Sequence, residues 1–288
     1  MERVGTVAIV GVGLIGGSIG MALKVRGGCA RVVGIGRDRA KLDEAMRLGA
    51  IDEGTTDLAS GVSGADVAVV CTPVNRIAAD VSALAAHGPS DLLITDAGST
   101  KGRIVAAVEG HKEARARFVA AHPIAGSERQ GAAFGRADLL DGRLCVLTPT
   151  PRTPADRVRR AETFWSSLGA TVFLMSPADH DAALALTSHL PHAVASVLAA
   201  SVPPETLRLA AGAYRDSTRV AAADAGLWTA IFRDNRGPLL DAIGKFQDQL
   251  SALKFALMAD DDEAIRACWE SGREHRLIYE RRESSKNR

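Results

Sequence analysis

The 288-residue chain lacks several features that would place it in a specialised class of protein. Its four cysteines, Cys29, Cys71, Cys145 and Cys268, are far apart and form no C-x-x-C pair, which predicts a reduced protein with incidental thiols. We find no leader segment and no unbroken apolar run of membrane-spanning length, so we expect a cytoplasmic location. The net charge of +1 gives no electrostatic reason to expect nucleic acid or a membrane surface as a partner.

What the sequence does contain is an ordinary globular composition, 47% hydrophobic and 24% charged, in a length that predicts about two domains. Apolar runs of strand length recur at 7–10, 31–35, 65–71, 92–96, 118–121, 144–148 and 171–175. Amphipathic helical stretches separate most of these runs, for example at 41–48, 77–86 and 155–168. This alternation predicts an α/β fold, a Rossmann-type doubly wound parallel sheet.

The character of the sequence changes after Ser176-Pro177. Strand signals disappear, and stretches rich in Ala, Leu, Asp and Arg show helical periodicity up to the polar tail. We therefore predict a dinucleotide-binding domain over residues 1–175 and a helical substrate and dimerisation domain over 176–288. Because the helical part has several strongly apolar faces, we expect some of them to be buried in a homodimer.

The first apolar run leads directly into a glycine-rich loop. Gly11, Gly13 and Gly16 follow the strand in G-x-G-x-x-G spacing, and helical periodicity begins at once. Gly11 allows the tight turn, Gly13 lets a pyrophosphate approach the backbone, and Gly16 lets the helix pack on the sheet. Free N–H groups and the positive dipole end of that helix would hold the phosphates. The strand–loop–helix context predicts a dinucleotide site.

Further residues are predicted to hold the cofactor at neighbouring strand ends. The end of the second strand is usually acidic in a NAD site, but here it holds Gly36 followed by Arg37. A guanidinium pairs well with a 2′-phosphate, which favours NADP over NAD. The alternative is that Arg37 is a solvated loop residue and Asp38 serves as the acid. The predicted cofactor-binding residues are Gly11, Gly13, Leu14, Ile15, Gly16, Arg37, Thr72 and Pro73.

Polar clusters lie where a doubly wound fold binds its ligands, or in the helical part expected to face them. The first spans Asp96 to Lys101, and the second spans His122 to Glu128. The third combines Ser188-His189-Leu190-Pro191-His192 with the segment from 214 to 219. The H-x-x-H pair lacks a convincing third ligand, so we expect no metal.

The ordered motifs resemble those of the prephenate/arogenate dehydrogenase family of tyrosine biosynthesis. They are G-x-G-L-I-G-G-S near the start, D-x-G-S-x-K, H-P-x-x-G-x-E, S-H-L-P-H, R-D-x-T-R and W-x-x-I-F-x-x-N. The likeness covers essentially the whole chain. It implies an oxidative decarboxylation in which C4 of a cyclohexadienol loses a hydride to the nicotinamide, the C4 hydroxyl loses its proton, and the ring carboxylate leaves as CO2. The substrate is prephenate or arogenate, and no residue decides between the two.

The resemblance assigns roles to the residues at the strand ends. His122 corresponds to the catalytic histidine that accepts the hydrogen bond of the C4 hydroxyl, a suitable task for a neutral imidazole. Ser99 corresponds to the serine that bonds the same hydroxyl, a role compatible with capping the next helix. Lys101 is expected to neutralise charge near the substrate, with a solvated helix residue as the alternative. Glu128 is expected to touch the substrate side chain.

Residues of the helical part complete the expected site. Arg219 corresponds to the arginine that binds the ring carboxylate, and His189 to the histidine near the substrate side chain. Arg215 lies one helical turn from Arg219 on the same face, so spacing alone does not choose between them. Asp216 either orients Arg219 or forms a surface ion pair. His192 is interpreted as a core histidine, and Trp228 and Asn235 as packing and capping residues.

Two other functions compete with the dehydrogenase. One is a hydroxyacid or imine reductase with a helical dimer domain, which would usually place a proton-donating lysine on a helix. Lys245 and Lys254 of the helical part lie in no such motif. The other is a noncatalytic dinucleotide sensor, which would bind the cofactor without turnover. The concentration of titratable groups at strand ends favours an enzyme.

Overall fold

A computed structural model describes residues 4–126 and 129–286 of the chain. Two compact units are present, residues 1–238 and residues 239–288. The division falls inside the predicted helical domain, and the predicted domain boundary near residue 175 stays a prediction. The polar clusters singled out in the sequence all belong to the first unit.

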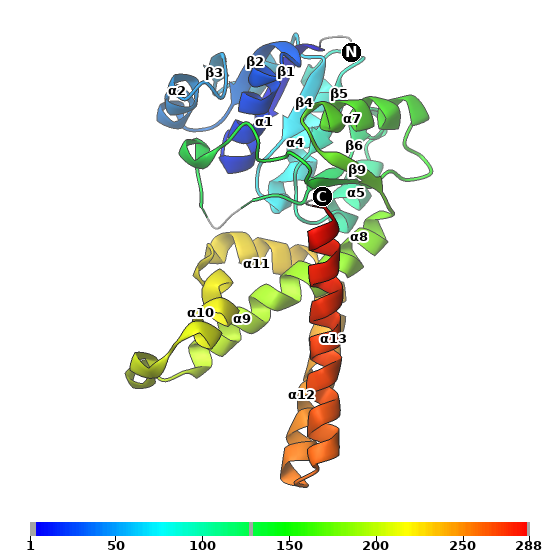
Figure 1. Ribbon diagram of the computed structural model, residues 1–288. Helices are drawn as coiled ribbons and strands as arrows, with labels where there is room; N and C mark the ends of the chain where they lie inside the picture. Colours follow the sequence, from blue (N-terminus) through cyan, green and yellow to red (C-terminus); the bar gives the residue numbers. More distant parts are fainter. Residues whose placement is uncertain (1–3, 127–128, 287–288) are drawn as a thin grey trace. The chain divides into compact units, whose positions relative to one another are not determined.

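The first unit is built on a six-stranded sheet in the order β3-β2-β1-β4-β5-β6, in which neighbouring strands run parallel. Strand order reverses between β1 and β4, and a sheet of this kind binds ligands beyond the carboxyl ends of its strands at that point. The sheet confirms the predicted α/β fold (Figure 1). Its strands are β1 (Val4–Val10), β2 (Cys29–Ile35), β3 (Glu53–Thr55), β4 (Val67–Val70), β5 (Leu93–Asp96) and β6 (Phe118–Val119).

Helices cover both faces of this sheet, because alternate side chains of each strand point in opposite directions. Val7 and Ile9 of β1 pack in one apolar cluster with residues of α1 and α7, whereas Ala8 and Val10 pack in a second cluster with residues of α4 and α5. The helices of this part of the chain are α1 (Leu14–Val25), α2 (Arg39–Arg47), α3 (Leu58–Val62), α4 (Val74–His87), α5 (Gly102–Glu109), α6 (Lys112–Arg117) and α7 (Ala155–Ser167).

The later strands form a separate sheet, which the sequence did not predict. β7 (Ala121–Pro123) pairs antiparallel with β8 (Leu144–Leu147), and β8 pairs parallel with β9 (Thr171–Leu174). The apolar run at 118–121 is divided, because the chain leaves β6 after two residues and joins the second sheet as β7. The short 3-10 helix η1 (Ala132–Phe134) lies between β7 and β8 and contacts α1 near Gly17. His122 is therefore held by the second sheet.

A long helical run follows β9. It consists of α8 (Pro177–Leu184), one wide π-helical turn η2 (Ala185–His189) and α9 (Leu190–Ser201). The Leu190 N–H reaches back five residues to the Ala185 carbonyl, and Pro191 offers no N–H to the following turn. The remaining helical elements of this unit are η3 (Pro204–Leu209), α10 (Gly212–Thr218), η4 (Arg219–Ala222) and α11 (Ala225–Asp234).

The run Pro177–Ser201 is long and apolar enough to cross a membrane by length and composition, with a mean hydropathy of 1.3 over its most apolar window. Polar residues interrupt this helix, so it is not an unbroken apolar run of the kind that the sequence analysis found to be absent. Only 17% of that window is buried within the chain. His180 and His189, however, are buried, and each bonds to other residues of the same unit. The run is thus packed into the unit through its polar side chains.

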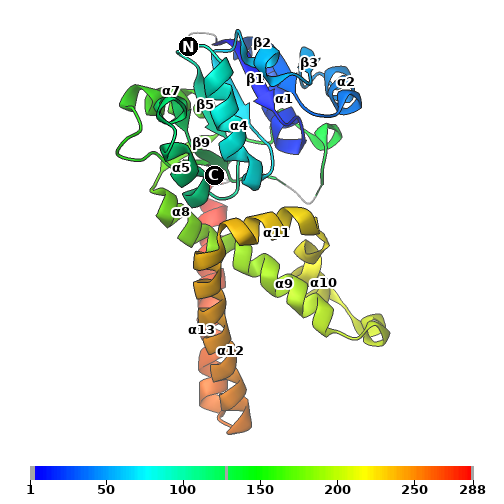
Figure 2. The same ribbon diagram turned by 180° about the vertical axis from the view of Figure 1, so that it is seen from behind.

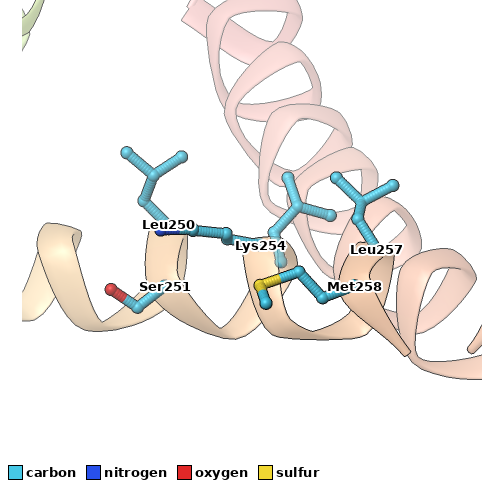
Figure 3. A pocket seen from close by; sticks show the side chains of 6 residues that line it. Leu250, Ser251, Lys254, Leu257 and Met258 are labelled. Carbon is cyan, nitrogen blue, oxygen red and sulfur yellow. The ribbon is translucent and has the colours of Figure 1, made fainter. Parts of the chain in front are cut away.

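The second unit is a hairpin of two long helices, α12 (Arg236–Met258) and α13 (Asp262–Lys286), which lie side by side in both views (Figure 2). Asp260 takes a positive φ of 50° in the connection, and the Asp261 carboxylate accepts the Ala264 N–H at the start of α13. A shallow hollow on α12 is lined by Leu250, Ser251, Leu253, Lys254, Leu257 and Met258 (Figure 3). Its walls are mostly apolar, and it lies outside the unit that carries the polar clusters.

Candidate active site

The glycine-rich loop between β1 and α1 has the geometry of an anion site. Gly11 has a φ of 91°, and a Cβ there would lie 2.8 Å from the Cys71 carbonyl oxygen. A Cβ on Gly13, by contrast, would meet no atom within 4 Å. Gly13 begins α1 without a side-chain cap, and the first turn carries no acidic residue. Leu14 and Ile15 in that turn are half-buried. The helix N-terminus is thus open to a phosphate.

The end of β4 lies beside this loop. The Cys71 N–H donates to the Val10 carbonyl at 2.7 Å, and the would-be Cβ of Gly11 lies 3.2 Å from the Thr72 nitrogen. The Thr72 hydroxyl donates to the buried Asp80 carboxylate at 2.6 Å, and Pro73 starts α4. Thr72 and Pro73 are therefore next to the glycine loop, at the sheet edge where the sequence predicts the cofactor.

The end of β2 resolves the two interpretations of Asp38. Its carboxylate caps α2 by accepting the N–H groups of Ala40 at 3.0 Å and Lys41 at 3.3 Å. Arg37 is exposed, and its guanidinium contacts no partner in the part of the chain that the structure describes. Asp38 is thus engaged with its own helix, whereas Arg37 is available to a ligand.

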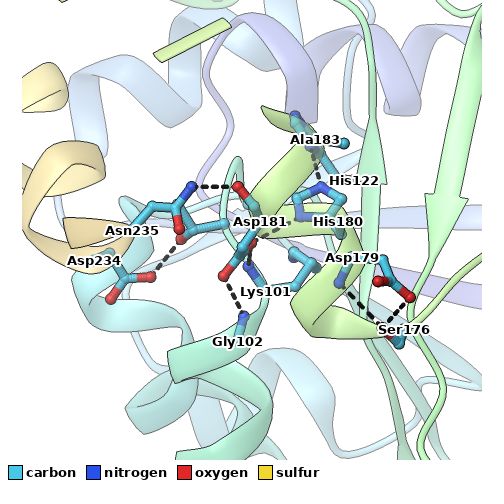
Figure 4. A network of polar contacts seen from close by, with 12 residues as sticks. Lys101, Gly102, His122, Ser176, Asp179, His180, Asp181, Ala183, Asp234 and Asn235 are labelled. Carbon is cyan, nitrogen blue, oxygen red and sulfur yellow. Dashed lines mark hydrogen bonds and ion pairs between the residues drawn. The ribbon is translucent and has the colours of Figure 1, made fainter. Parts of the chain in front are cut away.

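The predicted base, His122, heads a chain of buried polar side chains (Figure 4). Its Nδ1 lies 2.9 Å from Nε2 of His180, and Nδ1 of His180 lies 2.8 Å from Oδ1 of Asp181. His180 is completely buried, and Asp181 is 6% exposed. Burial lowers the pKa of His122 well below its usual value, and the neighbouring side chains of His180, Lys101 and His189 act in the same direction. His122 is neutral at neutral pH.

Asp181 is fixed by the start of α5. Its Oδ1 accepts the Lys101 N–H and its Oδ2 accepts the Gly102 N–H, both at 2.8 Å. Burial alone would raise the pKa of Asp181, but the hydrogen bonds from His180 and from these two amides outweigh it and hold the pKa below its usual value. The carboxylate is consequently ionised and accepts hydrogen bonds only.

Lys101 has a different position from the one expected of a substrate-binding residue. Its side chain is fully buried, and its ammonium pairs with Asp96 and donates to the Ala121 carbonyl at 2.7 Å. Asp96 also accepts the Ala121 N–H at 2.9 Å, so this ion pair joins the end of β5 to the start of β7. These contacts favour a structural role for Lys101. The burial of Lys101 excludes the alternative interpretation that it is a solvated helix residue.

Ser99 lies in the β5–α5 connection, two residues before Lys101, and is half-buried. Its hydroxyl has no hydrogen-bond partner among the described residues, and it does not cap α5, which has no side-chain cap. The neighbouring Thr100 hydroxyl bonds instead to Asp234 at the end of α11. Ser99 thus keeps its hydroxyl free for a ligand. Glu128 lies outside the described residues.

His189 is buried and holds an unsatisfied polar atom. Its Nδ1 lies 2.9 Å from Nδ2 of Asn235, which also donates to the Asp181 carbonyl at 2.7 Å. Nε2 of His189 is buried without a partner in the described part of the chain. Burial lowers the pKa of His189 to about 4; the Asp181 carboxylate opposes this shift, and the neighbouring His180 and His192 rings add to it. The ring is neutral, with Nδ1 accepting from Asn235 and Nε2 carrying the hydrogen.

The two candidate arginines differ in their surroundings. Arg215 forms an exposed ion pair with Asp216 at 3.0 Å, which is the surface ion pair that was one of the two interpretations of Asp216. η4, which begins at Arg219, contacts α9, which carries His192, and the charge of Arg219 lowers the pKa of His192 in addition to the larger effect of burial. His192 stacks on Trp228 with ring centroids 3.6 Å apart. Arg219 is the better placed of the two.

The geometry agrees with comparisons to known proteins. Residues 19–174 match the family model described as the prephenate dehydrogenase nucleotide-binding domain, and residues 176–270 match the one described as the prephenate dehydrogenase dimerization domain. The chain belongs to the prephenate dehydrogenase family.

Similar members of this family come from several bacteria. The chain is 32% identical to a cyclohexadienyl dehydrogenase of Zymomonas mobilis over 94% of each sequence, and 31% identical to a prephenate dehydrogenase of Bacillus subtilis over 94% of this chain and 75% of that one. Among solved structures, the Aquifex aeolicus prephenate dehydrogenase in complex with hydroxyphenyl propionate and NAD+ has a TM-score of 0.88 at 32% identity, covering 96% of this chain and 99% of that one. The Synechocystis arogenate dehydrogenase has a TM-score of 0.80 at 27% identity, covering 95% and 99%. These likenesses confirm the fold and family that the motifs predict.

Sequence reasoning missed three residues of this family member's polar network: His180, Asp181 and Asn235. The sequence D-H-D after Pro177 is typical of the polar face of a helix. Nothing in it predicts that His180 contacts His122, which lies 58 residues away in the chain. Asn235 was predicted to cap a helix, which it does at the end of α11. The one available signal for its further role was its place at the end of the W-x-x-I-F-x-x-N motif.

Among the described residues, no group of three or more His, Cys, Asp or Glu side chains is arranged to hold a metal ion. The cofactor that the family implies is a nicotinamide dinucleotide. The open turn at Gly13, the uncapped start of α1 and the free Arg37 fit such a molecule.

Proposed function

We propose that this protein is a prephenate or arogenate dehydrogenase of tyrosine biosynthesis, which removes a hydride and CO2 from a cyclohexadienol. The observation that carries the proposal is a neutral, half-buried histidine at the start of the second sheet, in a chain of this family that also has an open dinucleotide loop. When bound, the nicotinamide supplies the acceptor for the hydride.

His122 takes the proton of the substrate's C4 hydroxyl. Because its pKa is held low, the imidazole is unprotonated at neutral pH and can accept a hydrogen bond through Nε2. Removal of this proton from the hydroxyl stabilises the positive character that develops at C4 as the hydride leaves, and the ring becomes aromatic as the carboxylate departs as CO2. The unbonded Ser99 hydroxyl is suited to orient the same C4 oxygen.

The substrate's two acidic groups are held by residues of the helical part. Arg219 offers a planar fork to the ring carboxylate, in keeping with its place beside His192. His189 presents Nε2–H to an oxygen of the substrate side chain, since that nitrogen is buried without a partner in the described part of the chain. We also retain Glu128 as a side-chain contact, on the family likeness alone. Lys101 acts by holding β5 and β7 together.

The dinucleotide lies on the loop from Gly11 to Gly16, with Thr72 and Pro73 at its side. We propose NADP as the preferred cofactor, because Asp38 is occupied as a helix cap and Arg37 is free to pair with a 2′-phosphate.

The protein acts as a homodimer through its helical part. Large apolar side chains remain exposed there in the single chain, including Val197 at 70%, Phe255 at 66% and Trp269 at 78%. This region matches the family's dimerization domain. The four cysteines form no disulfide in the described structure, in keeping with a reducing compartment, and we place the enzyme in the cytoplasm.

The decisive experiment follows nicotinamide reduction by the purified protein with NAD or NADP, each combined with prephenate or arogenate. We expect turnover with at least one substrate, and faster turnover with NADP. His122→Asn should lose activity but still bind the dinucleotide. Bound dinucleotide without turnover in any combination would contradict the proposal and favour another reductase or a sensor.

A further inference from the structure

His122, His180 and Asp181 form an unbranched chain of side-chain hydrogen bonds whose donors and acceptors can be assigned from its far end. Both oxygens of Asp181 accept a backbone N–H from the start of α5, and these hydrogen bonds help to hold its pKa low, so the carboxylate is ionised and only accepts. Oδ1 must then accept from Nδ1 of His180. Nδ1 of His122 and Nε2 of His180 lie 2.9 Å apart, and with the hydrogen of His180 on Nδ1, its Nε2 has the lone pair that can accept from Nδ1 of His122.

The same assignment determines which nitrogen of His122 can accept a proton. If Nδ1 of His122 carries the hydrogen, Nε2 of the neutral ring has the free lone pair. That nitrogen has no hydrogen-bond partner among the described residues, so it is the one available to a substrate hydroxyl. The opposite tautomer would present an N–H there and could not accept a proton.

We propose that His180 and Asp181 are positioning residues that fix the tautomer of His122, so that Nε2 is the nitrogen that receives the substrate's proton. The inference rests on the proposed function for the identity of the base. The proton passes from the C4 oxygen to Nε2 and stays there until His122 returns it to solvent. The imidazolium so formed keeps donating Nδ1–H to His180, and the Asp181 carboxylate stabilises its charge through that ring.

Asp181 also caps α5, so a change at Asp181 alters the fold as well as the chain. His180 bonds only to His122 and Asp181 among the described residues, and it is the cleaner position to test. His180→Gln places a carbonyl oxygen where Nε2 of the ring was, and can accept from His122. His180→Leu fills similar space and accepts nothing.

The matched control is Asp179→Asn. Asp179 precedes His180 on α8 but is exposed, and its carboxylate accepts from Ser176 at 2.6 Å at the start of the helix. This substitution perturbs the same turn of helix without touching the chain of histidines. We expect it to leave both kcat and the tautomer of His122 unchanged.

The first measurement is nitrogen NMR of the full-length protein labelled with 15N-histidine, in which a ring nitrogen that carries hydrogen is distinguished from one that does not. His122→Asn identifies the signals of His122. We expect the wild type to carry hydrogen on Nδ1 of His122, His180→Gln to retain that tautomer, and His180→Leu to give a mixture. Hydrogen on Nε2 of His122 in the wild type would overturn the proposal.

The second measurement is steady-state kinetics of the same variants. Because general-base catalysis contributes about 10²- to 10⁴-fold, we expect His180→Leu to lower kcat by about 10²-fold with little change in KM, and His180→Gln to recover most of the loss. Equal activity of the Leu and Gln variants would overturn the positioning role. If the wild type turns over neither substrate, the proposed function fails, and the NMR result still decides whether the tautomer is fixed.

Discussion

The buried imidazole of His189 predicts a specific weakness of this protein in acid. Burial brings its pKa from 6.5 to about 4. Between these two values the unfolded chain binds a proton at His189 that the folded chain excludes. The free energy of unfolding therefore falls as the pH drops from 6.5 towards 4, and this contribution is constant above pH 6.5.

The size of the effect follows from the difference in pKa. One pKa unit corresponds to about 1.4 kcal/mol, so the full loss is about 3 kcal/mol, of which about 2.5 kcal/mol is reached at pH 4.5. This is a large part of the typical stability of a domain, about 5–15 kcal/mol. His122 and His192, whose pKa values are also lowered, add losses of the same sign.

Urea unfolding followed by tryptophan fluorescence at pH 7.5 and pH 4.5 measures this loss. His189→Gln removes the titrating ring and should make the difference between the two pH values smaller by about 2.5 kcal/mol. His275→Gln removes an exposed histidine of α13 and should leave the acid loss in place. If His189→Gln and the wild type lose equal stability in acid, His189 is not held neutral by the fold, and its assignment as an Nε2–H donor is wrong.

Three further predictions concern the glycine loop, the buried ion pair and the cofactor. Gly20→Ala should lower the free energy of unfolding by at least about 1–3 kcal/mol, because its Cβ would lie 1.9 Å from a backbone oxygen. Gly13→Ala, whose Cβ would meet no atom within 4 Å, should leave urea unfolding unchanged and weaken dinucleotide binding in calorimetry by tenfold or more. Lys101→Met should lower the free energy of unfolding by about 3–5 kcal/mol in urea, because it leaves Asp96 buried without a counter-charge. Adding Asp96→Asn should recover part of this loss, and losses of stability that simply add would argue against the ion pair. Arg37→Ala should raise KM for NADP about tenfold, the equivalent of roughly 1.4 kcal/mol, and leave KM for NAD unchanged; equal changes for both cofactors would contradict a 2′-phosphate contact.

The dinucleotide loop could be predicted because its determinants are local. A buried apolar strand, three glycines at fixed spacing and an amphipathic helix occupy fewer than about 20 consecutive residues, and each feature has a direct steric or electrostatic cause. The strand that carries His122 was harder to predict from the sequence. The run from Phe118 to Ala121 is uniformly apolar, and nothing in it records that pairing passes from β5 to β8 within three residues.

The histidine chain could not be predicted for a related reason. His180 and Asp181 are common polar residues on a helix, and their role depends on where β7 and α5 lie in space. Their contacts span 58 and 80 residues of sequence, and a single chain gives no signal for such distances. The family motifs located His122 and His189, because those positions carry recognisable patterns, and left their supporting residues unassigned.

The wide turn at Ala185–His189 sets the rotational phase of the helix that carries these groups. Nine residues separate His180 from His189, which is two and a half turns of a regular α-helix and would put the two rings on opposite sides. The π-helical turn takes up one extra residue and so reduces the rotation between them. Both rings can then reach the group around Asp181, one through its carboxylate and the other through Asn235. If the same nine residues formed a regular α-helix, His189 would be rotated by about 100° away from Asn235 relative to His180, so the wide turn is as much a part of the site as the histidines themselves.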